Sequence, residues 1–260
     1  MPCPRCSRKD DPEPQLIGVT GTHVLACSEG GNGNAKGQRN MRHKLVKIAL
    51  LHALQETARH GYKIKLSEPV VSDFFMPKPD RPHADKPLLP SENRADIQVE
   101  MGGRVILIDT VVAHPTIRSK PTAAKTPGIA AAVAHDAKCT KYSSRFDLPV
   151  GSLVPFAIET GGRWHQEARD FVKQWVKWGM SSAVGTPPDM SDPQTRFTYV
   201  ARVSRIRASV SLALAIGVVH TLKHAVTHLT RPTTASPNPS PSDNVSDDDE
   251  AGALGERVAC

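Results

Sequence analysis

The chain has 260 residues, 39% of them hydrophobic and 23% charged, a composition typical of a soluble protein with one ordinary domain and small attachments. Its longest apolar run, residues 209–219, is shorter than a bilayer span, and no signal segment opens the chain, so we expect neither a transmembrane nor a secreted protein. The net charge is +7, but residues 231–260 carry −4, so the rest carries +11, which indicates either a polyanionic partner such as nucleic acid or a solvated basic surface.

The first 30 residues predict a small metal-binding module. Three of the five cysteines lie here, and an odd number of cysteines without a secretion signal favours metal ligands over disulfides. Cys3-x2-Cys6 supplies two thiolates from one tight turn, and His23-x3-Cys27 places an imidazole and a thiolate one helical turn apart. These four residues form the ligand set of a closed structural zinc site, unless His23 and Cys27 are core residues of a first helix. A module this short would depend on zinc for its stability.

Hydrophobic patterns divide the central chain into regular elements. Apolar residues at helical spacing predict helices over residues 39–60, 128–143, 164–178 and 194–229. Alternating or β-rich runs predict strands over residues 62–66, 94–100, 104–112 and 153–159, the second and third joined as a hairpin at Gly102-Gly103. This order predicts an α/β fold in which helices flank a small mixed sheet.

Composition sets the outer boundaries of the central domain. A Gly/Asn-rich connector at residues 30–34 precedes it, and a Pro/Gly-rich break at 185–193 follows it. We therefore divide the chain into a zinc knuckle (1–30), a central α/β domain (39–180) and a helical extension (190–230). Residues 231–260 are rich in Pro, Ser and Asp, and they predict a disordered acidic tail.

Two aspartates in the predicted hairpin indicate a divalent-metal site. Asp96 lies in the first strand and Asp109 ends the second, so the tight turn brings both carboxylates to one end of the sheet. An acid at the end of an apolar strand is costly unless it binds something, and carboxylate oxygens suit Mg²⁺. Glu68, at the end of the preceding strand, is a further candidate. The alternative for each of them is a surface carboxylate at a strand end, and for Glu68 the two interpretations have equal weight.

Basic residues crowd the start of the first predicted helix. They are Arg39, Arg42, His43, Lys44 and Lys47. Such a cluster predicts either a face that contacts nucleic-acid phosphates or an ordinary solvated face.

Three segments taken together resemble the PD-(D/E)XK nuclease superfamily: Arg94-Ala95-Asp96, the run from Arg104 to Asp109, and Lys138-Cys-Thr-Lys141-Tyr142. More narrowly, residues 3–178 are similar to the restriction-like endonuclease domain at the C-terminal end of site-specific non-LTR retrotransposon proteins. In that family a Cys-Cys-His-Cys zinc knuckle precedes the nuclease, as Cys3, Cys6, His23 and Cys27 do here. The family's proline before the first aspartate is Ala95 in this chain. The lysine that commonly follows the second acid is replaced by Val111, and this family takes its lysine from the next helix.

The resemblance implies a DNA endonuclease that uses Mg²⁺ or Mn²⁺ in addition to structural zinc. Asp96 and Asp109 would hold the catalytic metal, with Glu68 assisting. Lys138 or Lys141 would act on the attacking water, unless both lysines merely contact phosphate or solvent. DNA is the implied partner, and element RNA or a reverse transcriptase is a further candidate. No membrane partner is implied. The expected location is nuclear. The alternative is a zinc-containing DNA-binding remnant that has lost catalysis.

Overall fold

The structure is a computed structural model that describes residues 34–59, 61–81, 89, 93–115, 126–181 and 186–230. The predicted zinc ligands Cys3, Cys6, His23 and Cys27 lie outside these residues, as does the predicted acidic tail over residues 231–260. The fold and the sites below are therefore those of the central part of the chain.

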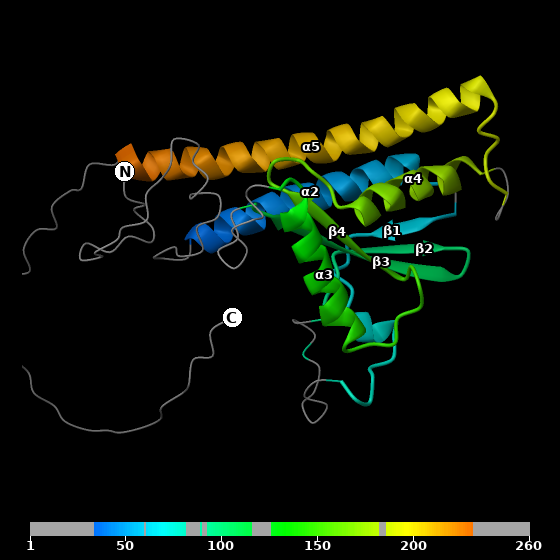
Figure 1. The fold of residues 1–260 in the computed structure, drawn as a ribbon, viewed down its shortest axis with the longest axis horizontal. Helices are drawn as coiled ribbons and strands as arrows, with labels where there is room; N and C mark the ends of the chain where they lie inside the picture. The colour runs from blue at the N-terminus through cyan, green and yellow to red at the C-terminus, as the bar shows by residue number, and fades with distance from the viewer. Residues whose placement is uncertain are drawn as a thin grey trace, which may run out of the picture. The chain divides into compact units, whose positions relative to one another are not determined.

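The described residues form a mixed α/β fold with a small sheet, as the element order predicts (Figure 1). In chain order the elements are α2 (Asn34–Thr57), β1 (Lys63–Lys65), the 3-10 helix η2 (Val71–Asp73), β2 (Ile97–Met101), β3 (Arg104–Ala113), α3 (Ile129–Ser143), β4 (Leu153–Glu159), α4 (Gln166–Met180) and α5 (Pro193–Thr230). The strand order is β1-β2-β3-β4, antiparallel from β1 to β3 and parallel between β3 and β4. The parallel pair is joined through α3, as a parallel connection requires.

Both aspartates lie at other places in the hairpin than predicted. Strand β2 begins at Ile97, so Asp96 precedes the strand. Strand β3 continues to Ala113, so Asp109 lies in its interior and does not end it. The reason is the pairing with β4, which extends from Leu107 opposite Leu153 to Ala113 opposite Glu159. Local sequence cannot reveal this partner, because the two strands are separated by a helix.

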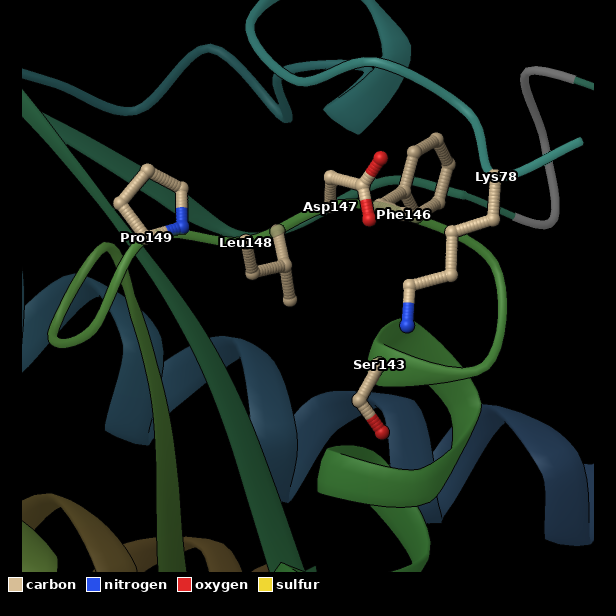
Figure 2. Close-up of a pocket in the computed structure, with 6 residues that line it drawn as sticks. All are labelled: Lys78, Ser143, Phe146, Asp147, Leu148 and Pro149. Carbon is tan, nitrogen blue, oxygen red and sulfur yellow. The ribbon is translucent and has the colours of Figure 1, made fainter.

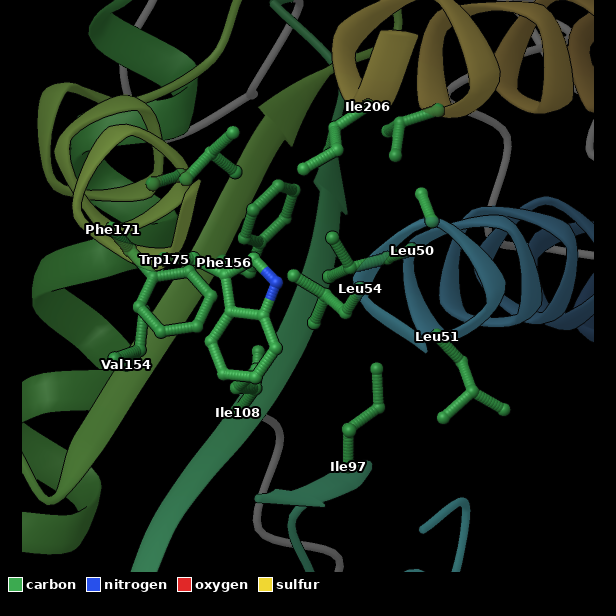
Figure 3. Close-up of a cluster of buried hydrophobic side chains, with 14 of the residues drawn as sticks. Leu50, Leu51, Leu54, Ile97, Ile108, Val154, Phe156, Phe171, Trp175 and Ile206 are labelled. Carbon is green, nitrogen blue, oxygen red and sulfur yellow. The ribbon is translucent and has the colours of Figure 1, made fainter. Parts of the chain in front are cut away.

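Side chains of alternate strand residues enter two separate cores, because successive residues of a strand face opposite sides of the sheet. The larger core lies between the sheet and helices α2, α4 and α5, and it includes Ile97, Ile108 and Phe156 (Figure 3). The smaller core lies on the other face and joins Leu107 to Tyr142 and Phe146 near the end of α3. Helix α3 thus packs on the opposite face of the sheet from the larger core.

Helix α5 belongs to the larger core. Its side chains Ile206, Val210 and Leu214 are almost fully buried there, so the predicted helical extension shares the hydrophobic core of the central domain. By length and composition alone, the helix over Pro193–Lys223 also contains an 18-residue window apolar enough to cross a membrane, with a mean hydropathy of 1.3 in that window. The apolar segment of the helix is longer than the run of residues 209–219 on which the sequence expectation depended, because the helix continues on both sides of that run. A helix with one face in a core passes the same test.

Two glycines allow the helices to pack closely. A Cβ at Gly179 of α4 would lie 2.3 Å from the carbonyl oxygen of Thr57, at the end of α2. A Cβ at Gly217 of α5 would lie 2.9 Å from Cγ of Arg42 on α2. Close to Gly179, the indole Nε1 of Trp175 donates a hydrogen bond of 3.0 Å to the hydroxyl of Thr57. The end of α2 is therefore fixed against α4 by a bond and a close contact.

We expect Gly179→Ala to lower the free energy of unfolding by about 1–3 kcal/mol, the usual cost of overpacking a tight contact. Helix propensity alone would make this substitution stabilising by about 1 kcal/mol, so a loss isolates the contact with Thr57. Urea or thermal denaturation followed by circular dichroism measures the change. Gly161→Ala is the matched control, because a Cβ at this exposed residue meets nothing within 4 Å and its φ is not positive. Equal stability of the two variants would contradict the packing described here.

Candidate active site

Asp109 lies inside β3 and is buried, with 3% of its surface exposed. Lys138 of α3 donates a hydrogen bond of 2.7 Å from Nζ to Asp109 Oδ2. The hydroxyl of Tyr142, one turn later on α3, also lies 2.7 Å from Oδ2 and 2.7 Å from the carbonyl oxygen of Arg94. A hydroxyl has one proton, so it donates to one of these oxygens at a time. Both contacts come from the helix that covers this face of the sheet.

The surroundings of Asp109 favour its protonated form. Burial raises the pKa of Asp109, and the opposing effect of the Lys138 charge is met by the neighbouring negative charge of Asp96. The pKa of the Tyr142 hydroxyl is raised by its own burial and by Asp109. A second positive charge beside Asp109 would favour the ionised carboxylate, and a divalent cation provides such a charge.

Asp96 lies next to Asp109 at the start of the hairpin, where its backbone N–H donates to the carbonyl of Ile108 at 2.9 Å. Its Oδ2 accepts hydrogen bonds from Thr110, from the backbone N–H at 2.7 Å and from the hydroxyl. Nε2 of His43 on α2 lies 3.1 Å from the same oxygen. Burial alone would raise the pKa of Asp96, but the hydrogen bond and charge of His43 and the bonds from Thr110 lower it to about 2. Asp96 is therefore ionised at neutral pH.

Lys47 links Asp96 to Glu68. Its Nζ lies 3.5 Å from Asp96 Oδ1 and donates a bond of 2.7 Å to Glu68 Oε1. Burial alone would lower the pKa of Lys47, but the bond to Glu68 and the charge of Asp96 raise it. Glu68 is half exposed and has a positive φ of 45°, a backbone conformation that non-glycine residues seldom adopt. Such strain is often found beside functional sites.

The structure brings three of the predicted catalytic residues together: Asp96, Asp109 and Lys138. Glu68 reaches the group through Lys47. Lys141 contacts Tyr142, with its Nζ 3.5 Å from the hydroxyl and 4.7 Å from the centre of the ring. Of the two candidate lysines, Lys138 therefore makes the direct contact with a carboxylate.

Sequence reasoning missed the roles of His43, Lys47, Thr110 and Tyr142. It placed the first two among basic residues facing phosphate or solvent, whereas Lys47 is 7% exposed and both side chains meet Asp96. Arg42 is also buried, against α5, and only Lys44 of the cluster's described side chains is exposed. The spacing of His43 and Lys47, one helical turn apart, was the available signal for a shared target.

Glu159, at the end of β4, holds the first turn of α3. Its Oε1 accepts hydrogen bonds from the backbone N–H groups of Ala130 at 3.0 Å and Ala131 at 3.4 Å. A negative charge at a helix N-terminus satisfies free amides and interacts favourably with the helix dipole. This contact fixes the end of the helix that carries Lys138.

A pocket lies at the C-terminal end of α3. Its lining comes from Lys78, from Ser143 at the end of the helix, and from Phe146 to Pro149 in the segment that follows (Figure 2). In Figure 2 the Lys78 ammonium points toward Ser143. Neither aspartate of the site lines this pocket, and we assign the chemistry to the carboxylates.

We expect the pKa of His43, measured by NMR titration without added divalent metal, to lie above 6.5. Burial alone would lower it, but the hydrogen bond and charge of Asp96 raise it, so Asp96→Asn should bring it below 6.5. Because the folded pKa is raised, the stability from this pair is complete below pH 6.5 and is lost as pH rises through the folded value. Asp170→Asn, an exposed acid on α4, should leave the titration of His43 unchanged. An unchanged pKa in Asp96→Asn would contradict the pairing.

Comparison with protein-family models and with the curated proteins gives no match to this chain. The functional argument therefore depends on the geometry of the site: two adjacent carboxylates on a hairpin, a lysine from the next helix on one of them, and a histidine and a lysine on the other.

Proposed function

We propose that this chain is a Mg²⁺- or Mn²⁺-dependent DNA endonuclease of the PD-(D/E)XK type, derived from a non-LTR retrotransposon and acting in the nucleus. The observation that carries the proposal is the contact of 2.7 Å between Lys138 and Asp109, with Asp96 beside them. An acid immediately before β2, an acid inside β3 and a lysine from the following helix are the catalytic residues that the sequence resemblance requires, in the order that it requires them.

The donor set is suited to a hard divalent cation. Carboxylate oxygens are the ligands that Mg²⁺ prefers, and it commonly binds one or two carboxylates while keeping several waters. The bonds from Lys138 and Tyr142 both reach Oδ2 of Asp109, which leaves Oδ1 for an ion. Oδ1 of Asp96 has a contact of 3.5 Å with Lys47. Asp96 and Asp109 would therefore hold the ion, which would supply a more acidic water and positive charge at the phosphate.

The residues of this chain have distinct parts in the hydrolysis. Water attacks the phosphorus while the P–O3′ bond breaks, so the products are a 5′-phosphate and a 3′-hydroxyl that takes up a proton. The Lys138 ammonium would orient the attacking water and neutralise charge that develops on the phosphate. His43 and Lys47 would hold Asp96 in its ionised form. A reverse transcriptase, as a further partner, would extend this 3′-hydroxyl with element RNA as the template.

The proposal includes structural zinc at Cys3, Cys6, His23 and Cys27. The four ligands satisfy the usual tetrahedral Cys₃His set. Their role would be to stabilise a DNA-contacting module ahead of the nuclease, in keeping with the charge of +11 outside the acidic tail.

A second candidate function is a DNA-binding remnant without catalysis. One observation favours it: both aspartates are buried, and Oδ2 of Asp96 already accepts bonds from Thr110 and lies within reach of His43. In this alternative the three acids and their basic partners form an ion network that stabilises the fold. Activity assays on the variants below separate the two candidates.

We expect Asp109→Asn to reduce Mg²⁺-dependent nicking of supercoiled plasmid to the background rate, because a charged ligand is lost. DNA binding, measured by fluorescence anisotropy, should persist or tighten, since one negative charge near the phosphate is gone. Replacing Mg²⁺ with Ca²⁺ should suppress nicking by the native chain, because Ca²⁺ binds at longer distances and with looser geometry. Asp170→Asn, an exposed carboxylate on α4, is the matched control and should nick normally. Equal nicking by native protein and Asp109→Asn would favour the remnant.

We expect Lys138→Ala to lower the nicking rate by about 100-fold or more, the usual effect of removing one group that stabilises transition-state charge. DNA affinity should change little. Lys141→Ala is the matched control on the same helix, and it should keep most of the nicking rate because Lys138 contacts Asp109 directly, whereas Lys141 contacts the hydroxyl and the ring of Tyr142. Single-turnover rates at saturating DNA make the comparison. A larger loss in Lys141→Ala would reverse the assignment of the catalytic lysine.

A further inference from the structure

A second cluster of chemically reactive side chains lies between α3 and α4. His135 and Cys139 are one turn apart on α3, and Glu167 lies in the first turn of α4. One ligand atom from each of the three lies within 4.8 Å of the others. The proposed nuclease function uses none of them. His135-x3-Cys139 repeats the spacing of His23-x3-Cys27 in the predicted zinc knuckle.

The three side chains of this cluster converge, and the distance between two of their ligand atoms matches a pair of zinc ligands. Cys139 Sγ lies 3.6 Å from His135 Nε2. Zinc bonds of about 2.05 Å to nitrogen and 2.3 Å to sulfur, at a tetrahedral angle, separate the two ligand atoms by about 3.6 Å. The carboxylate of Glu167 hydrogen-bonds directly to Nε2 of His135, so the exposed Glu167 side chain would move back for an ion to lie between the two atoms. An imidazole nitrogen, a thiol sulfur and a carboxylate oxygen thus meet around one point.

The other nitrogen of His135 has the partner that a metal-binding histidine requires. Nδ1 lies 3.0 Å from Oδ1 of Asp136. Metal-binding histidines commonly donate their second N–H to a carboxylate, which fixes the tautomer and leaves Nε2 for the ion. The ring of His165 stacks on His135, with 3.8 Å between centres, and its Nδ1 accepts from the backbone N–H of Glu167. The His135 ring is therefore held in orientation by its neighbours.

The electrostatics of the cluster favour a bound cation. Two carboxylates, Asp136 and Glu167, flank the imidazole of His135, whose side chain is 12% exposed. Burial alone would lower the pKa of His135, but the bonds to these carboxylates raise it. A divalent ion would bind Nε2 of His135 without its proton and the Cys139 sulfur as thiolate, so that ion binding releases protons.

We propose that His135, Cys139 and Glu167 bind one divalent ion of the zinc type, with solvent as the fourth ligand. The mixed nitrogen, sulfur and oxygen donors suit Zn²⁺ better than Mg²⁺ or Ca²⁺, which take oxygen ligands. Glu167 is 44% exposed, so one side of the site is open to solvent. The ion would connect α3 to α4, in addition to the packing of both helices on β4. This proposal is independent of the nuclease function.

The test must separate this site from the predicted zinc knuckle in the same chain. The full-length protein is loaded with Zn²⁺, dialysed and analysed for metal per chain. Cys139→Ser should hold one equivalent less than the native chain, whereas Cys260→Ser, the matched control, should hold the native amount. With Co²⁺ in place of Zn²⁺, the thiolate-to-metal charge-transfer absorption should fall in Cys139→Ser and be unchanged in Cys260→Ser. Equal metal content in native chain and Cys139→Ser would overturn the proposal.

A second variant distinguishes loss of metal binding from loss of the fold. Glu167→Gln changes a half-exposed side chain and keeps its size, so circular dichroism should match the native protein. Competition with a chromophoric zinc chelator should show that the His135–Cys139–Glu167 site binds zinc at least about 10-fold more weakly than in the native chain. The remaining zinc should be bound as tightly as in the native chain. Native affinity in Glu167→Gln, together with full zinc content in Cys139→Ser, would mean that the cluster is a hydrogen-bond network without a metal.

Discussion

A carboxylate buried inside an apolar strand is the constraint on which the rest of this structure depends. Asp109 lies in β3 among Ile106, Leu107 and Ile108, and an unpaired charge there would be costly. Lys138 and Tyr142 supply its partners, and both come from α3. Because these two contacts require one helix in one position, the acid determines where α3 lies on the sheet. The smaller core, which includes Tyr142 and Leu107, then packs around that contact.

Each face of the sheet has its own set of paired charged side chains, and the two sets lie next to each other at the β2–β3 hairpin. On the α3 face, Asp109 pairs with Lys138, and on the α2 face, His43 and Lys47 pair with Asp96. Thr110 joins the two sets, because it follows Asp109 in β3 and donates two hydrogen bonds to Asp96. The opposite shifts of the two aspartate pKa values follow from this arrangement. One acid is surrounded by donors and stays ionised, while the other is dominated by burial.

Local patterns in the sequence were sufficient for most of the elements. Strand β4 and helix α3 lie at or within one residue of their predicted bounds, because each is set by its own periodicity and by flanking glycines. The bounds of β3 were also predicted to within one residue, but Asp109 was placed at its end, whereas the pairing with β4, about 40 residues away in sequence, puts it in the interior. The roles of His43 and Lys47 were missed for a similar reason. Helical spacing shows that they share a face, but only packing decides whether that face meets solvent or an aspartate.

Glu159 has a consequence for how this chain tolerates change. It holds the first amides of α3, whereas Lys138 lies more than two turns further along the same helix. A rigid helix transmits a shift at its first turn along its whole length, so the reach of Lys138 to Asp109 is determined partly by a carboxylate on another strand. The position of Lys138 at Asp109 thus depends on the register with which β4 pairs with β3. Substitutions at the end of β4 would therefore change the position of Lys138 relative to Asp109, although they contact neither residue.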